Sequence, residues 1–462
     1  MEDSLELDPG LLRRYDQLGP RYTSYPTAPH FGRGFGEPEY RASAERSNAA
    51  PIPADLSLYV HVPFCFNPCF YCGCTRIITR DRARGAPYVA RVLEEAALVS
   101  PLFDEDREVV QLHLGGGTPN FLDGGALAML VEGLAARFRF SGSPDRDFSI
   151  EIDPRGVEPG EIARLAELGF NRASLGVQDF DPAVQRAVNR LQGVEQTLAV
   201  IADCRANGMR SVNVDLIYGL PKQTMRGFER TLDVLTDARP DRFAIYGYAH
   251  LPEIFKPQRK IAPAELPDAA QRLELLRLAV RMLGNRGYRF IGMDHFALPG
   301  DDLATAQAAG RLHRNFMGYT THDGCDLVGL GVSAISHFGD AYSQNFRELP
   351  AWELAVSEGR LPVWRGLALA ADDVLRADVI EGLMCQGEID VARIEHDYGI
   401  DFASYFGDAL EKLGRLAADG LVAVGGARIR VTSSGRLLLR VIAMCFDRYI
   451  AAAQAARYSQ VV

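Results

Sequence analysis

Between residues 56 and about 300, short apolar runs alternate with amphipathic stretches. Runs rich in β-branched or other apolar residues predict strands at 56–62, 109–114, 148–152, 172–177, 212–217, 243–248 and 288–293. Apolar residues at three-to-four spacing between these runs predict helices at 88–99, 127–138, 162–168, 194–207 and 228–235. Because strands alternate with helices, we predict an α/β fold in which a parallel sheet of about six units forms an open or partial barrel.

The segments on either side of this alternation have different patterns. Residues 1–55 are rich in Pro, Gly, Arg and Tyr, which predicts a loop-rich N-terminal extension on a domain edge. From about residue 350 the sequence predicts helices, followed by apolar runs at 420–424 and 429–436 that suggest a two-stranded wing. We therefore expect an extension at 1–55, a barrel with its own extension at 56–345, and a mostly helical, winged-helix-like cap domain at 346–462.

Composition and charge narrow the classes of function. The chain has 462 residues, with 50 basic and 60 acidic side chains and a net charge of −10, which argues against a general nucleic-acid binder. No apolar run approaches the roughly 20 residues of a membrane helix, and no basic start with an apolar core opens the chain. We expect a cytoplasmic monomer with reduced thiols and no membrane or nucleic-acid partner. DNA binding by the wing-like module alone is the weaker alternative.

Four of the eight cysteines lie within ten residues, just after the first predicted strand. Cys65, Cys69 and Cys72 have the spacing C-x3-C-x2-C, and Cys74 follows them. A zinc site usually takes its ligands from two separated pairs, but here the other four cysteines are isolated. A compact set of three thiolates suits a [4Fe–4S] cluster in which one iron remains free to bind a substrate or a cofactor.

Glycines and polar side chains occur at the carboxyl ends of the predicted strands. Residues 115–118 (Gly-Gly-Gly-Thr) follow the second strand, Glu151 ends the third, Gln178 follows the fourth, and Asp215 lies in the fifth. In barrels of this type the active site forms at this end, because the βα loops converge there. The glycines fit a tight turn or a close approach of a ligand, and Glu151 fits a helix cap or a ligand contact. Taken alone, Asp215 fits a hydrogen-bonded strand-end acid, and Arg190 fits a surface charge.

The cysteine spacing, with Tyr71 before Cys72, resembles the cluster loop of the radical S-adenosylmethionine (SAM) superfamily. Cys74 and the sequence YVHVPFC at 59–65 narrow the resemblance to the oxygen-independent coproporphyrinogen III oxidases. The resemblance continues through SIEIDPR at 149–155, RASLGVQDF at 172–180, NVDLIYGLPKQT at 213–224 and YAHLP at 248–252. It also includes GPRYTSYPT at 19–27, LHRNF at 312–316 and GLGVSAIS at 329–336. The order Phe70-Tyr71 differs from that in some relatives, so the packing of the loop stays open.

The resemblance implies a partial (β/α)6 radical-SAM barrel and a set of cofactor contacts. It implies a [4Fe–4S] cluster held by Cys65, Cys69 and Cys72, with SAM on the free iron, and a catalytic role for Cys74. It also implies two SAM molecules. The first would lie beside Tyr59, Gly116, Glu151 and Ile335, and the second beside Gly117, Thr118, Gln178, Arg190, Asp215 and Ala249.

The resemblance also implies the reaction. One electron from an unidentified donor protein would cleave SAM, and the resulting 5′-deoxyadenosyl radical would remove a β-hydrogen from a propionate of coproporphyrinogen III. Loss of carbon dioxide and one electron then leaves a vinyl group, and two such conversions give protoporphyrinogen IX in haem synthesis. The alternative is a haem-binding or haem-transferring relative on the same fold. Such relatives generally lack the equivalents of Cys74 and of residues 20–27, and this chain has both.

The four propionates of such a substrate need positively charged partners, because burying a carboxylate without one is costly. Arg21 lies in the extension, and a basic cluster of Lys256, Arg259 and Lys260 follows the sixth predicted strand. Both positions are expected at the mouth of the barrel. We predict that Arg21 and Arg259 bind substrate carboxylates; the alternative for each is a solvated surface charge.

Overall fold

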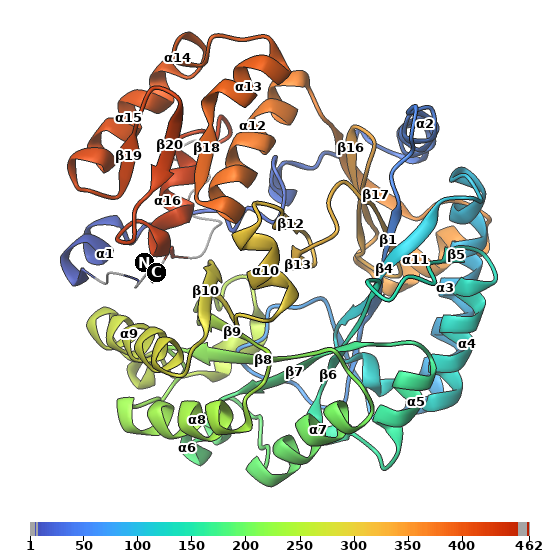
Figure 1. Cartoon of the computed structure of the whole chain (residues 1–462). Helices are drawn as coiled ribbons and strands as arrows, with labels where there is room; N and C mark the ends of the chain where they lie inside the picture. Colours follow the sequence, from blue (N-terminus) through green and yellow to red (C-terminus); the bar gives the residue numbers. More distant parts are fainter. Residues whose placement is uncertain (1–4, 6–7, 451–459, 462) are drawn as a thin grey trace.

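The computed structural model describes residue 5, residues 8–450 and residues 460–461 (Figure 1). Its centre is a 13-stranded sheet. Neighbouring strands pair in parallel in the order β9-β8-β7-β6-β4-β1. These strands are β1 (Leu56–Val62), β4 (Glu108–Gly116), β6 (Asp147–Ile152), β7 (Arg172–Gln178), β8 (Ser211–Tyr218) and β9 (Arg242–Gly247). The first six predicted strands are therefore confirmed, with ends that differ by at most two residues.

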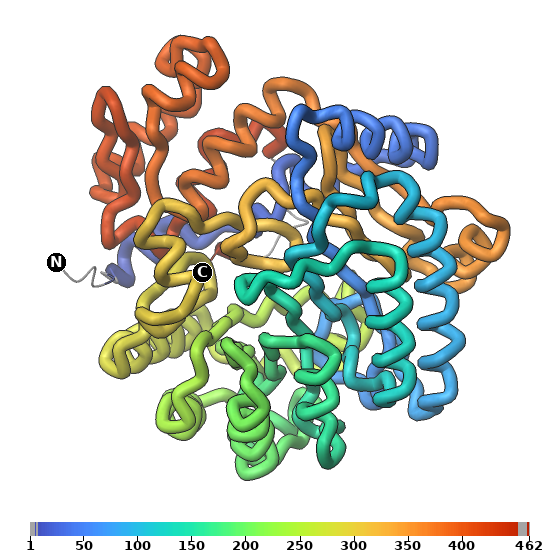
Figure 2. The backbone as a smooth tube through the Cα atoms, turned by 45° about the vertical axis from the view of Figure 1, so that its right-hand side comes forward, coloured from blue at the N-terminus to red at the C-terminus, as the bar shows by residue number. Residues whose placement is uncertain are grey.

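Helices connect these strands and form an outer layer on the sheet (Figures 1 and 2). The predicted helices are confirmed as α3 (Gly85–Val99), α4 (Gly124–Ala135), α5 (Glu161–Glu167), α7 (Val194–Ala206) and α8 (Met225–Ala238). The predictions missed α6 (Pro182–Ala187) and the long helix α9 (Ala269–Asn285). The buried positions of α9 include 273, 276, 280 and 283, a three-to-four spacing that would have indicated this helix.

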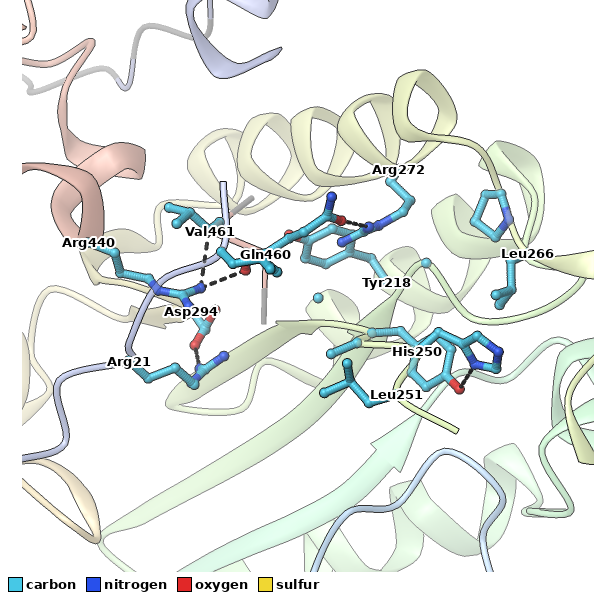
Figure 3. Close-up of a pocket in the computed structure, with 16 residues that line it drawn as sticks. Arg21, Tyr218, His250, Leu251, Leu266, Arg272, Asp294, Arg440, Gln460 and Val461 are labelled. Carbon is cyan, nitrogen blue, oxygen red and sulfur yellow. Dashed lines mark hydrogen bonds and ion pairs between the residues drawn. The ribbon is translucent and has the colours of Figure 1, made fainter. Parts of the chain in front are cut away.

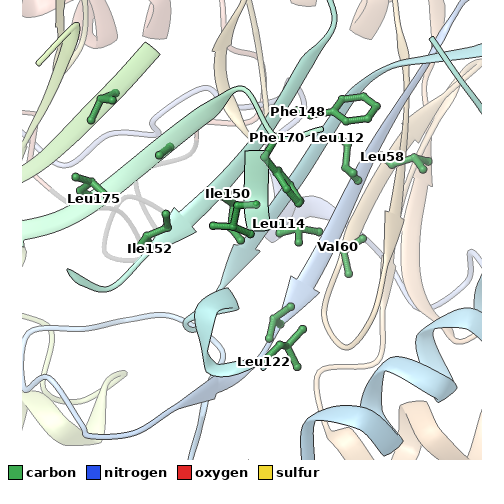
Figure 4. Close-up of a cluster of buried hydrophobic side chains, with 14 of the residues drawn as sticks. Leu58, Val60, Leu112, Leu114, Leu122, Phe148, Ile150, Ile152, Phe170 and Leu175 are labelled. Atoms are coloured by element: carbon green, nitrogen blue, oxygen red, sulfur yellow. The ribbon is translucent and has the colours of Figure 1, made fainter. Parts of the chain in front are cut away.

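Side chains of the parallel strands alternate between two environments. One set is buried in the main hydrophobic core, toward the helices (Figure 4): Leu58, Val60, Leu112, Leu114, Phe148, Ile150, Ile152 and Leu175. The positions between them line a cavity on the inner face: His113, Ser149, Glu151, Ser174 and Asp215. A period of two therefore separates the apolar core from a polar interior.

Both edges of the sheet extend beyond the predicted parallel units. On one side β14 (Asp326–Leu330) pairs in parallel with β1, and β15 (Ile335–Phe338), β16 (Ala341–Asn345) and β17 (Val363–Ala368) follow antiparallel. On the other side β11 (His295–Ala297) and β10 (Arg289–Gly292), the strand predicted at 288–293, are antiparallel. The pairs β10–β11, β14–β15 and β15–β16 are joined by connections too short for a crossover helix, whereas α11 (Leu349–Ser357) lies between β16 and β17. Strand β17 follows the expected domain boundary at residue 346 but still belongs to this sheet.

Shorter elements complete the region around the sheet. Strands β2 (Phe64–Cys65) and β3 (Ile77–Ile78) pair in parallel, and β5 (Arg139–Phe140) pairs with β4. Helix α10 (Asp302–Ala308) precedes a hairpin of β12 (His313–Asn315) and β13 (Gly318–Thr320). This hairpin lies near the centre of the view in Figure 1, between the barrel and the C-terminal helices.

The N-terminal extension is more structured than its composition predicts. It contains α1 (Pro9–Tyr15) and α2 (Glu37–Asn48). The carboxylate of Asp419 in the C-terminal module accepts hydrogen bonds from Arg14 and Tyr15, whereas α2 packs against β15, β16 and β17. Mean hydropathy is low in α2, so the pattern of apolar residues there did not predict a helix. The extension therefore runs from the C-terminal module to one edge of the large sheet.

The C-terminal module lies in a second hydrophobic core, which it shares with Leu12, Tyr22 and Tyr25 of the extension and with residues of α9, β10 and α10. Its helices are α12 (Ala371–Glu381), α13 (Val391–Tyr398), α14 (Phe402–Tyr405), α15 (Gly407–Ala418) and α16 (Leu439–Met444), and α11 (Leu349–Ser357) precedes β17. The predicted wing is a three-stranded sheet of β18 (Glu388–Asp390), β20 (Arg428–Val431) and β19 (Val422–Val424), so one of its strands was missed. Within the described ranges, no helix has the length and apolar character needed to span a membrane.

Candidate active site

The clustered cysteines line one cavity of about 270 Å³ at the carboxyl ends of the parallel strands. Cys65 ends β2, and Cys69, Cys72 and Cys74 lie in the loop that leads to β3. All are free thiols. The same cavity is lined by most of the other predicted site residues: Gly116, Gly117, Thr118, Glu151, Gln178, Arg190 and Asp215. The structure thus brings together side chains from the cysteine loop and from the ends of β4, β6, β7 and β8.

Hydrogen-bond donors surround the sulfur atoms. The Thr118 hydroxyl donates to Cys65 Sγ at 3.3 Å, and the backbone N–H of Cys74 donates to Cys72 Sγ at 3.4 Å. Arg190 Nη1 lies 3.7 Å from Cys69 Sγ. Hydrogen bonding to Cys74 lowers the pKa of Cys72 to about 6. Donors of this kind stabilise anionic sulfur, as cluster ligation requires.

The arrangement of the thiols fits a cluster that fills a space between them. Across the parts of the chain that the structure describes, no three His, Cys, Asp or Glu side chains converge as the ligands of a single metal ion do. Cys65, Cys69 and Cys72 instead border a shared cavity, with Arg155 and Arg190 on its wall. Three thiols, a positively charged wall and this space agree with a [4Fe–4S] cluster held by three cysteines.

The glycine run marks a close approach between β4 and the loop after β1. Gly116 has φ +110°, and a Cβ there would lie 2.4 Å from His61 Cε1. A Cβ on Gly117 would lie 2.7 Å from the Pro63 backbone. Any larger residue would therefore push the cysteine loop away from the strand ends. Packing against this loop explains Gly116 and Gly117 better than a tight turn does.

Glu151 accepts a hydrogen bond from the Gly116 N–H at 3.1 Å and lies 3.5 Å from His113 Nε2. Burial favours a higher pKa, but the hydrogen bond and charge of His113 and the Gly116 N–H outweigh it, so the pKa of Glu151 is lowered. Because the carboxylate contacts the neighbouring strand, it is not a helix cap. The carboxylate of Glu151 is therefore ionised where it lines the cavity, and it can accept hydrogen bonds from hydroxyl groups.

Asp215 and Arg190 occupy the side of the cavity formed by the later strands. Asp215 accepts hydrogen bonds from Ser174 Oγ at 3.1 Å and Asn213 Nδ2 at 2.8 Å. Burial and the charge of Glu151 raise the pKa of Asp215 to about 7. Arg190 is 6% exposed and lies 3.3 Å from Asp153, so its interpretation as a surface charge is wrong.

Two residues expected at the first SAM, Tyr59 and Ile335, are not among the residues that line this cavity. The Tyr59 hydroxyl lies 3.1 Å from His61 Nδ1, and its ring stacks on His113 with centroids 5.9 Å apart. Tyr59 pairs with Gly329 of β14. A Cβ on Gly329 would lie 2.4 Å from the Ile335 carbonyl oxygen, so Ile335 lies directly across from β14. Tyr59 in β1 and Ile335 in β15 therefore lie on either side of β14 in the sheet.

Ala249 and Arg21 line a separate cavity of about 290 Å³ beyond the ends of β8 and β9 (Figure 3). Arg21 forms an ion pair with Asp294, and its guanidinium carbon lies 5.3 Å from the centroid of the Tyr246 ring. Tyr246 lines the cysteine cavity, so Arg21 contacts a ring that belongs to the wall of that cavity. Arg259 is different: its side chain is 55% exposed, donates to the Pro252 carbonyl and lines neither cavity.

Sequence reasoning missed further residues that line the cysteine cavity, among them Arg76, Arg155, Ser174 and Tyr246. Asp153 accepts hydrogen bonds from both Arg155 and Arg190, which fixes these two guanidinium groups beside Cys69. Strand periodicity would have pointed to Ser174 and Tyr246, since each lies at an inward-facing position. Nothing in the local pattern singles out Arg155 except its place in SIEIDPR.

Comparisons with known proteins agree with this geometry. Residues 59–235 match the family model described as the radical SAM superfamily, and residues 369–438 match the HemN C-terminal domain. The chain is 49% identical over 462 residues to an oxygen-independent coproporphyrinogen III oxidase of Pseudomonas aeruginosa, covering 100% of both chains. It is 47% identical to the Escherichia coli enzyme of the same name, covering 96% of each. The solved structure of coproporphyrinogen III oxidase (HemN) from E. coli superposes with a TM-score of 0.91 at 46% identity, covering 97% of this chain and 100% of that one.

Proposed function

Because this chain belongs to the family of oxygen-independent coproporphyrinogen III oxidases, we propose that it converts two propionate side chains of coproporphyrinogen III into vinyl groups. The product would be protoporphyrinogen IX, formed in haem synthesis without oxygen. The observation that carries the proposal is one cavity that joins Cys65, Cys69 and Cys72 to Glu151 and Asp215. These are the groups that a radical SAM enzyme needs at its strand ends.

Radical SAM enzymes use a [4Fe–4S] cluster and SAM, and the cavity fits both. In our proposal Cys65, Cys69 and Cys72 hold the cluster. With one added electron, the bound cluster and SAM would supply the radical chemistry that removes a hydrogen atom from the propionate. In each conversion the propionate side chain therefore loses one hydrogen atom, one molecule of carbon dioxide and one electron. Cys74 also lines the cavity, which supports a catalytic role for its thiol.

The protein groups bind and orient the cofactors. We propose that Glu151, with its lowered pKa, accepts hydrogen bonds from a ribose of the first SAM, next to Gly116, Tyr59 and Ile335. The second SAM would contact residues on the other side of the cavity. These residues are Gly117, Thr118, Gln178, Arg190, Asp215 and Ala249. All except Ala249 line the cysteine cavity, and Ala249 lines the neighbouring one.

Further expectations from the sequence complete the proposal. We propose that Arg21 binds a substrate carboxylate, which its place beside Tyr246 supports. We also propose that the chain divides into residues 1–55, 56–345 and 346–462. Strand β17 belongs to the last part but pairs with β16 of the large sheet. A separate one-electron donor protein, a monomeric state and a cytoplasmic location remain predictions. A haem-transfer relative is disfavoured because Cys74 and residues 20–27 are both present.

An anaerobic assay tests the function. Reconstituted protein is given a reductant, SAM and coproporphyrinogen III, and protoporphyrinogen, methionine and carbon dioxide are measured. We expect two molecules of carbon dioxide for each molecule of protoporphyrinogen. Haem binding or transfer without any loss of carbon dioxide would instead identify a haem-handling relative.

A further inference from the structure

Arg314 lies in β12 opposite Tyr319 of β13, and its guanidinium carbon is 4.6 Å from the centroid of the Tyr319 ring. Its Nε and Nη1 atoms are buried and have no hydrogen-bond partner among the residues that the structure describes. A buried guanidinium usually donates to carboxylates or carbonyl groups, because unsatisfied donors are costly. Stacking on Tyr319 holds this group flat and leaves the Nε–H and Nη1–H groups available for acceptors in its plane.

Positive charge is concentrated around Arg314, although the chain as a whole is acidic. Burial and the charges of Arg314, Arg21 and Arg242 lower the pKa of His295 well below its usual value, so this ring is neutral. Burial and the charge of Arg314 also lower the pKa of Arg21. Arg21 and Arg242 are each paired with a carboxylate, Asp294 and Asp301, whereas Arg314 has buried donors that lack an acceptor.

A row of aromatic rings connects Arg314 to the candidate active site. The rings of Tyr319 and His295 have centroids 5.3 Å apart, and those of His295 and Tyr246 are 6.2 Å apart. All three line the inner cavity that also contains Glu151. Since Arg21 stacks on Tyr246, Arg21 and Arg314 lie at the two ends of this row.

Arg314 itself lines a cavity of about 110 Å³ whose wall includes residues 22–25 of the extension. At about 30 Å³ per water, this space corresponds to roughly three to four water molecules, enough for a short carboxylate side chain. Asn315 lines both this cavity and the inner one, so the two are neighbours.

Besides three tyrosines, Glu381 and His337 border this small cavity, and Glu381 accepts a hydrogen bond from the backbone N–H of Arg314. Glu381 lies 3.2 Å from His313 Nδ1, and this contact raises the pKa of His313 despite burial, so the carboxylate has its own cation. Burial lowers the pKa of His337 to about 4, so its ring is neutral. Neither side chain supplies an acceptor for the unsatisfied Nε–H and Nη1–H groups of Arg314.

We propose that Arg314 binds a propionate carboxylate of the tetrapyrrole substrate through its unsatisfied N–H groups. The proposal rests on the function proposed above and adds a second anchor at the opposite end of the aromatic row from Arg21. A guanidinium and a carboxylate form paired, charge-assisted hydrogen bonds, which a neutral ester cannot replace. Two anchors on different propionates would fix which side chain of the macrocycle faces the cofactors.

Binding of coproporphyrin III, the oxidised and stable form of the substrate, tests this proposal by fluorescence titration. Its tetramethyl ester, in the same detergent buffer, carries no carboxylate. We expect Arg314→Met to weaken binding of the acid about ten-fold or more, while binding of the ester changes less than about two-fold. Arg311→Met removes the same charge from an exposed position three residues away and should leave both affinities unchanged.

The variants also separate this proposal from the proposed function. Arg314→Met should keep the iron content and the reductive SAM cleavage of the wild type, with a raised KM for coproporphyrinogen III. Arg314→Lys keeps the charge without the planar fork and serves as the folded variant if the Met variant is unstable. If wild-type protein turns over the substrate but the soluble Arg314 variants keep its preference for the acid over the ester, the Arg314 assignment is overturned. If wild-type protein shows no turnover, the proposed function fails instead.

Discussion

The cysteine cavity and the cavity around Arg21 are built in different ways. The first lies where β4, β6, β7 and β8 end, so its walls come from successive strands and the loops after them. The second brings Arg21 of the extension against Tyr218 of β8 and Arg440 of α16, residues that lie far apart in the sequence (Figure 3). One site follows from the order of the strands, and the other depends on how the ends of the chain dock.

The two cavities also differ in what holds their charged groups. Around the cysteines, Asp153 is the shared acceptor for Arg155 and Arg190. In the other cavity Arg440 donates to the backbone carbonyls of Gly19, Pro20 and Gln460, and burial lowers its pKa to about 9. Changes in the first region should therefore alter cofactor binding, whereas changes in the second should alter how the extension presents Arg21 to the substrate.

The largest effect that this contrast predicts is loss of the cluster. Replacing Cys65, Cys69 or Cys72 by Ser removes one of three thiolate ligands, so we expect bound iron to fall sharply and turnover to disappear. Iron is measured after anaerobic reconstitution. Cys74→Ser is the matched control and should keep near-normal iron, because SAM takes the fourth iron. Near-normal iron in any of the first three variants would show that its residue is not a ligand.

The next largest effect concerns Arg190, on the side of the cavity formed by the later strands. Arg190→Ala leaves Asp153 with one cation fewer in a buried site, where breaking an ion pair typically costs about 3–5 kcal/mol of stability. If two SAM molecules bind, we expect the variant to lose the second one, seen as a lower stoichiometry by equilibrium binding, while the iron content stays near normal. Arg186→Ala, an exposed change on α6, should bind SAM like the wild type. Unchanged stoichiometry and affinity in Arg190→Ala would contradict the assignment.

The contrast between the cavities also explains how much the sequence could predict. Strand periodicity and the cysteine spacing predicted the parallel core and most of the cysteine cavity, because these features are local. Glu151, Gln178 and Asp215 lie at the ends of predicted strands, and parallel order brings such ends together.

The features that the sequence could not predict depend on contacts between distant segments. Arg190 looked like a surface charge because nothing near it in the sequence shows that Asp153 and Cys69 pack against it. The antiparallel strands β15 to β17 are placed by pairing that begins at β14. The sequence did not indicate a binding role for Arg314, because its N–H groups are buried without a partner only when Tyr319 and the extension enclose it.

A smaller effect concerns the dependence of folding stability on pH. Glu95 of α3 is buried and accepts hydrogen bonds from the Gly331 N–H, Asn345 Nδ2 and Trp352 Nε1. Burial raises its pKa to about 7. Because the unfolded chain ionises Glu95 near pH 4.5, its stabilising contribution is complete below that pH and is lost as the pH rises to about 7. The loss is at most about 3 kcal/mol.

Chemical denaturation at pH 5 and pH 8 measures this contribution. Glu95→Gln cannot ionise, so the variant should lose less stability than the wild type between these two pH values. Glu94→Gln, an exposed change next to it in α3, should follow the wild type. The same decline in Glu95→Gln as in the wild type would assign the pH dependence to other groups.

The smallest effect should come from Arg259, which lines neither cavity. Arg21 is partly buried, pairs with Asp294 and stacks on Tyr246, so Arg21→Met should raise the KM for coproporphyrinogen III about ten-fold. Arg259 was predicted from the same reasoning about propionates, but its side chain is 55% exposed and screened by water. We therefore expect Arg259→Met to change KM by less than about two-fold, as surface substitutions usually do. Both variants should keep normal iron and SAM cleavage. A KM that rises equally in both would place a substrate carboxylate at Arg259, and an unchanged KM in both would move the carboxylate partners elsewhere, with Arg314 as the remaining candidate.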